Sequence, residues 1–201
     1  MYAKIYFLLF FSLFSLTEYY PELDSWNISN PEIEGVNQDK VDKLMDLSFS
    51  DDATQAVVIV KNGKIISERY SEGYDKNSHG TSWSMAKSYY AALIGISIDL
   101  GEIESLDENV SNYLEYYNDK RSEITIRDLL NMSSGLDFPS HEHEKMFFQV
   151  DHLKYAKKVN LEKNPGEKFE YNNVNSMILG EILLQATGKK AVSYTHLTLP
   201  T

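Results

Sequence analysis

The chain has 201 residues and carries 30 acidic against 19 basic side chains, which gives a net charge of −11. Its hydrophobic fraction of 42% and charged fraction of 24% are typical of a folded globular protein. The acidic balance disfavours nucleic acid and anionic lipid as partners, because both are bound through clustered Lys and Arg. The sequence has no cysteine, which excludes disulfides, thiolate metal ligands and a cysteine nucleophile.

The first 17 residues have the pattern of a secretory signal peptide. Lys4 precedes an apolar run over 5–16, and a small-x-small tripeptide ends at Thr17. A run of this length is too short to span a bilayer, so we expect no stable membrane span. The sequence therefore predicts a signal peptide over 1–17 and an exported protein, periplasmic or secreted. An uncleaved interfacial anchor is the alternative.

The last ten residues, VSYTHLTLPT over 192–201, resemble the translation of a transposase adapter used in DNA library preparation. We therefore interpret 192–201 as an adapter-derived artefact and expect the natural sequence to stop near Ala191. A genuine polar C-terminal strand is the alternative.

Between these ends, residues 18–36 are polar and rich in turn formers, and we interpret them as a leader segment on a surface. Asn37 can cap a short helix with one apolar face, made by Val41, Leu44, Met45 and Phe49. Two β-rich runs follow, at about 54–60 and 64–70. An Asn-Gly pair joins them, which is a strong signal for a hairpin.

The rest of the chain is predicted to be helical. Residues 84–100 are apolar nearly all round and end at Gly101, so this helix is expected to be buried. Shorter helices are predicted at about 107–114, 125–132, 150–158 and 173–187. A hairpin followed by helices indicates an α+β protein whose sheet is unfinished.

Ser84 and Lys87 form a Ser-x-x-Lys motif at the start of the predicted buried helix. Residues three apart on a helix share a face, so the lysine amine can reach the serine hydroxyl and act as its base. The free N–H groups and the dipole of the helix N-terminus favour a developing anion there. Such spacings are frequent by chance, and the position at the helix start is the informative part.

Tyr171 and Asn173 form a Tyr-x-Asn motif between a Pro-Gly-Glu turn and the last predicted helix. A tyrosine held near a lysine can act as a base and then as an acid, and an asparagine amide can bind a substrate carbonyl. Tyr116 and Asn118 make a competing pair. We prefer Tyr171, because it adjoins a rigid helix.

Three stretches together resemble the β-lactamase-related serine hydrolases, which include class C β-lactamases, D-alanyl-D-alanine carboxypeptidases, esterases and aminohexanoate-oligomer hydrolases. They are SWSMAKSYYAALIGISIDLGEIESLDENVSNYL, ITIRDLLNMSSGLDF and PGEKFEYNNVNSMILGEILLQATG. The resemblance covers about residues 54–188, and SWSMAKS is most similar to the aminohexanoate-oligomer hydrolases. It implies a β-lactamase/transpeptidase-like fold, with an antiparallel sheet flanked by helices and an all-helical region.

By this resemblance Ser84 is the acylated nucleophile, Lys87 its general-base partner, and Tyr171 and Asn173 the Tyr-x-Asn pair. The Ser84 backbone N–H would form part of the oxyanion hole. The family's third motif, Lys/His-Thr/Ser-Gly on a late strand, is not found in the chain. We therefore expect residues 37–191 to be a C-terminally truncated domain with an incomplete sheet, and the activity of this chain to be doubtful.

Other residues carry weaker signals. The run His141-Glu142-His143-Glu144 lacks an HExxH frame and is predicted to be a solvated loop, so no metal site is assigned. Trp83, next to the nucleophile, is a candidate substrate contact.

The resulting hypothesis is an exported serine hydrolase that forms an acyl-enzyme on an ester or amide of a small molecule or peptide. No cofactor is implied. The alternatives are a non-catalytic sensor that binds peptides or penicillins and an inactive fragment.

Overall fold

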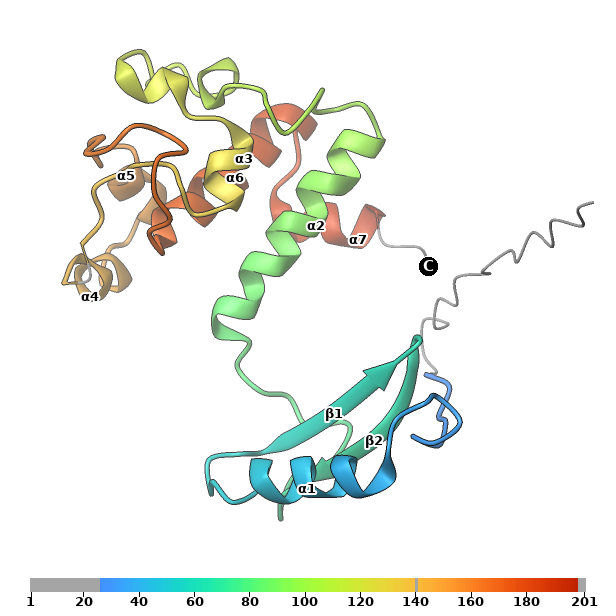
Figure 1. The fold of residues 1–201 in the computed structure, drawn as a ribbon. Coiled ribbons are helices and arrows are strands. Elements are labelled where there is room, and N and C mark those ends of the chain that lie inside the picture. The colour runs from blue at the N-terminus through green and yellow to red at the C-terminus, as the bar shows by residue number, and fades with distance from the viewer. Residues whose placement is uncertain (1–25, 140, 199–201) are drawn as a thin grey trace, which may run out of the picture. The chain divides into compact units, whose positions relative to one another are not determined.

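The computed structural model describes residues 26–139 and 141–198. The predicted signal peptide over 1–17 therefore lies outside the described residues, as does part of the leader. The chain divides into two compact units, residues 1–80 and 81–201 (Figure 1). None of the described helices is both long and apolar enough to cross a membrane.

The first unit is built on a helix and a hairpin that the sequence predicted. Helix α1 (Gln38–Ser48) begins after Asn37, whose side-chain oxygen accepts a hydrogen bond from the Lys40 N–H at 3.1 Å. Strands β1 (Ala56–Lys61) and β2 (Lys64–Tyr70) pair antiparallel. Asn62 and Gly63 between them have φ of 51° and 73°, the left-handed conformation that this hairpin turn requires.

Helix α1 lies alongside the hairpin (Figure 1). Arg69 of β2 joins the two, since its guanidinium lies 5.5 Å from the Phe49 ring and donates to Asp46 at 2.8 Å. Val41 and Met45 of the predicted apolar face are buried, whereas Leu44 is 49% exposed. The buried part of α1 is therefore narrower than its apolar face.

The leader does more than lie on a surface. Its Ile28 forms an isolated parallel bridge with Ile65, and the N–H of Ile65 donates to the Asn27 carbonyl at 2.9 Å. Glu34 accepts hydrogen bonds from Lys64 and Asn62 at the hairpin turn. The sequence could not indicate this pairing, because a two-residue bridge leaves no period.

The second unit is helical and centres on α6 (Asn173–Thr187). This helix packs against α2 (Ala86–Asp99), α3 (Ile126–Leu130) and α5 (His152–Ala156). The remaining helices are α4 (Glu142–Phe147) and α7 (Ala191–Thr198), with 3₁₀ turns at Trp83–Met85, Val110–Asn112 and Lys120–Glu123.

Two of these helices lie within predicted spans, and neighbouring residues define their ends. Thr125 caps α3 in a capping box with Asp128, and the helix ends at Leu130, inside the predicted span of 125–132. Helix α6 covers the whole predicted span and ends at Gly188, whose φ of 70° is the left-handed C-terminal conformation.

Two helix predictions and one loop prediction need correction. Helix α2 buries only Leu93, Ile94 and Ser97, and Tyr89 is 60% exposed, so the prediction of a helix buried all round was wrong. The apolar composition of a helix does not determine how much of its surface is covered by neighbouring elements. In place of the helix predicted at 107–114 there is a 3₁₀ turn, and 142–147 form a helix in place of the predicted loop.

Residues 191–198 form α7 and not the strand considered as an alternative for the tail. Tyr194 of this helix is buried, and its hydroxyl bonds to the side chains of Ser97 and Glu102. The adapter origin of 192–201 stays a prediction.

Candidate active site

Ser84 lies in the short 3₁₀ turn that leads into α2, and not on α2 itself as the sequence predicted. Ser84 is exposed and Lys87 is half-buried, so the motif is less buried than expected. The N–H groups of a first helical turn have no acceptor within the helix and can donate to an anion. One turn further on, the Lys87 amine donates a hydrogen bond to the Ser84 Oγ at 3.3 Å. The Ser-x-x-Lys pair is therefore in contact.

Tyr171 meets this pair from a segment 87 residues away in the chain. Its hydroxyl oxygen lies 2.6 Å from the Ser84 Oγ, and the Lys87 Nζ lies 4.9 Å from the centroid of its ring. Hydrogen bonding with Lys87, and next with Ser84, lowers the pKa of Tyr171 from its usual value, although burial opposes the shift. The three polar groups thus share one hydrogen-bond network, which favours the deprotonated form of Tyr171.

Asn172, which directly follows Tyr171, anchors the start of α6, and the sequence did not single it out. Its side chain is buried between two backbone partners: Oδ1 accepts from the Val174 N–H at 2.9 Å, and Nδ2 donates to the Leu136 carbonyl at 3.1 Å. The first bond caps α6, and the second ties the start of α6 to the loop that contains Leu136. A polar residue directly before a helical pattern is the signal that could have identified it.

The competing Tyr-x-Asn pair lies elsewhere in this unit. Tyr116 is half-buried and packs edge-on against the buried Tyr117, with ring centroids 5.0 Å apart. Burial raises the pKa of both tyrosines, which disfavours a phenolate. Tyr171, not Tyr116, therefore lies beside Ser84.

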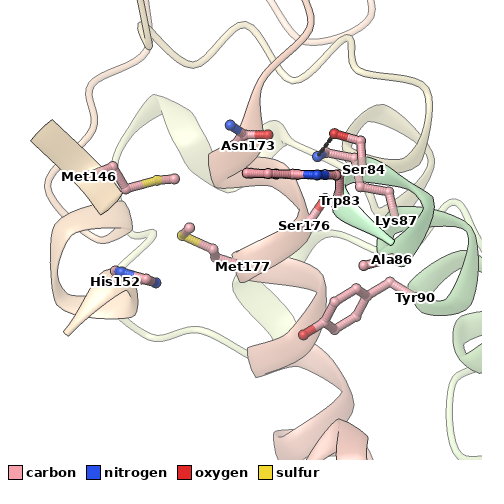
Figure 2. Close-up of a pocket in the computed structure, with 10 residues that line it drawn as sticks. All are labelled: Trp83, Ser84, Ala86, Lys87, Tyr90, Met146, His152, Asn173, Ser176 and Met177. Atoms are coloured by element: carbon pink, nitrogen blue, oxygen red, sulfur yellow. Dashed lines mark hydrogen bonds between the residues drawn. The ribbon is translucent and has the colours of Figure 1, made fainter. Parts of the chain in front are cut away.

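A cavity of about 350 Å³ opens beside Ser84 and Lys87 (Figure 2). Trp83 and Asn173 line it, which places both predicted substrate contacts at the same pocket. Trp83 has a φ of 43° and is 77% exposed. A positive φ is costly for a bulky residue and is concentrated at functional sites.

No metal centre is formed by the described residues, in which no three potential ligands of the histidine, cysteine and carboxylate types come together. Glu142, in the run once considered for a metal, instead accepts hydrogen bonds from Lys145 and Tyr155 at the start of α4. The side chains of His143 and Glu144 lie outside the described residues.

The beta-lactamase family matches residues 44–195, so the chain belongs to this family. Among curated proteins, it is 28% identical over 178 residues to Protein flp of Staphylococcus aureus strain N315. That alignment covers 79% of this chain and 35% of the relative.

Solved structures show the same fold. One from Bacillus anthracis, provisionally described as a 6-aminohexanoate-dimer hydrolase, has a TM-score of 0.61 at 21% identity and covers 86% of this chain and 50% of that one. A class C β-lactamase mutant has a TM-score of 0.60 at 20% identity, with 81% and 47% covered. The chain thus has part of a β-lactamase/transpeptidase-like fold and spans about a third of the curated relative and half of the solved structures.

Proposed function

We propose that the chain carries the acylation site of a serine hydrolase that acts on an ester or amide bond. Membership of the beta-lactamase family supports a hydrolase of this superfamily. The observation that carries the finer proposal is the contact of Ser84 with both Lys87 and Tyr171, at 3.3 and 2.6 Å. A serine in hydrogen-bond contact with candidate bases is the arrangement that nucleophilic catalysis requires.

In the proposed reaction, the Tyr171 oxygen accepts the Ser84 hydroxyl proton while the Oγ forms a bond to the substrate carbonyl carbon. Lys87 stabilises the phenolate, and the Ser84 N–H donates to the developing oxyanion. Tyr171 then returns the proton to the leaving oxygen or nitrogen as the bond from carbon to that atom breaks, which leaves an acyl-Ser84. Water attacks this ester with Tyr171 again as base, releases the acid and regenerates Ser84.

The side chain of Asn173 is proposed to bind the substrate carbonyl or amide, and Trp83 to form a wall beside it. Both line the cavity next to Ser84. The substrate is proposed to be a small molecule or a peptide, and the reaction needs no cofactor. Export remains a proposal that rests on the N-terminal sequence pattern.

The test is covalent labelling of the chain by a fluorophosphonate, together with acylation by an activated p-nitrophenyl ester. Mass spectrometry should place the adduct on Ser84, and Ser84→Ala should abolish it. Lys87→Ala and Tyr171→Phe should each slow acylation by about 10² or more, the scale of general acid–base catalysis. Tyr116→Phe is the matched control. Equal effects of the two tyrosine changes would contradict the assignment of Tyr171.

A further inference from the structure

The cavity beside Ser84 has one polar end and one apolar end. Its polar end is formed by Ser84, Lys87 and Asn173. Met146 and Met177 line the opposite side in Figure 2. If the substrate carbonyl lies at Ser84, the substrate group that occupies this cavity therefore extends toward the two methionines.

The apolar walls suit a flexible aliphatic group. Met146 is buried, Met177 is half-buried, and Trp83 and Tyr90 add aromatic surface. Unbranched thioether side chains adapt to ligands of irregular or variable shape. His152 adds a polar group near Met146 (Figure 2).

The position of Tyr171 indicates which half of the substrate occupies the methionine-lined cavity. Tyr171 does not line the cavity with the methionines but a neighbouring one, together with Asp137, Glu162 and Lys163. In the proposed reaction Tyr171 protonates the leaving group, so the leaving group faces this polar neighbour. The acyl group then occupies the apolar cavity.

We infer that the cavity between α2, α6 and the α4–α5 segment is an acyl pocket for linear aliphatic acids, with Met177 as a specificity-determining residue. This inference rests on the proposed function and deepens it. The volume of 350 Å³ corresponds to about twelve non-hydrogen atoms at roughly 30 Å³ each, the share of a water molecule in the liquid. This is room enough for a carboxyl group and a chain of about six to eight carbons.

The experiment compares acylation by p-nitrophenyl acetate, butyrate, hexanoate and octanoate, which share a leaving group and differ only in the acyl chain. Each fully buried methylene contributes a factor of about four. Because the pocket is open to solvent, the methylenes are only partly buried in it. We therefore expect the second-order rate constant for nitrophenolate release to rise at least about tenfold from acetate to hexanoate.

Met177→Ala should reduce this preference for hexanoate over acetate at least about threefold, the contribution of roughly one methylene. Leu184→Ala is the matched control, since it lies two turns further along the same side of α6 and does not line the pocket. A flat chain-length profile, or a preference that survives in a folded Met177→Ala variant, would overturn the inference.

A binding measurement separates failure of the inference from failure of the proposed function. In Ser84→Ala, with Trp26 replaced by Phe, Trp83 is the remaining tryptophan of the chain. Titration with hexanoate should change its fluorescence, and Met177→Ala should weaken that binding at least about threefold. Binding without any Ser84 adduct in the parent chain would refute the hydrolase and keep the pocket. A Ser84 adduct without hexanoate binding or chain-length preference would refute the pocket and keep the hydrolase.

Discussion

Replacing Asn172 by alanine should destabilise the second unit and misplace Tyr171. The side chain is 3% exposed and makes both bonds described above, to Val174 and to Leu136. Loss of a helix N-cap costs about 1 kcal/mol. A buried carbonyl left without its donor, here that of Leu136, costs about 1–3 kcal/mol. The free energy of unfolding should therefore fall by about 2–4 kcal/mol, a large share of a domain's typical stability.

One further variant separates the two contributions to this loss, and a second serves as the control. Asn172→Ser keeps a capping oxygen but has no amide to reach the Leu136 carbonyl, so it should lose only the second contribution, about 1–3 kcal/mol. Asn118→Ala, at the exposed asparagine of the competing motif, should be close to neutral. Urea unfolding followed by circular dichroism gives the stabilities, and the rate of Ser84 labelling reports on Tyr171. A stability of Asn172→Ala within about 0.5 kcal/mol of the parent chain would refute this reasoning.

Three other outcomes are expected. Because the pKa of Tyr171 is lowered, acylation should rise with pH through a pKa below that of a free tyrosine, and Tyr171→Phe should remove this limb from the pH–rate profile. Hydrogen bonds, above all from Lys64, lower the pKa of Glu34 from 4.5 to about 2, so its stabilisation is complete above about pH 4.5 and is lost as the pH falls toward 2. Acid titration of thermal stability should accordingly be flatter in Glu34→Gln. Gly135→Ala should cost at least about 2 kcal/mol in urea unfolding, because φ is 73° and a Cβ would lie 2.2 Å from the Lys163 carbonyl oxygen; an unchanged midpoint would contradict this close approach.

The sequence predicted well those features that neighbouring residues determine. Asn62-Gly63 produces the hairpin, Asn37 caps α1, and Gly188 ends α6, because a turn or a cap depends on local backbone conformation and one side-chain bond. The preference for Tyr171 over Tyr116 had a similar basis, since only Tyr171 directly precedes a long helix.

Features that depend on distant contacts were missed. The exposed face of α2, with Tyr89 on it, could not be distinguished from a buried one by apolar content. The bridge between Ile28 and Ile65 uses backbone groups that every residue has. The capping bond of Asn172 has a local signal, but its bond to the Leu136 carbonyl, 36 residues away, has none in the sequence.

The most direct test of the proposed acylation chemistry is peptide mass spectrometry of the chain after reaction with a fluorophosphonate. We predict one adduct, on Ser84, whose formation is slowed by Lys87→Ala and by Tyr171→Phe at unchanged circular dichroism. An adduct on another residue, or none on the folded chain, would contradict the account.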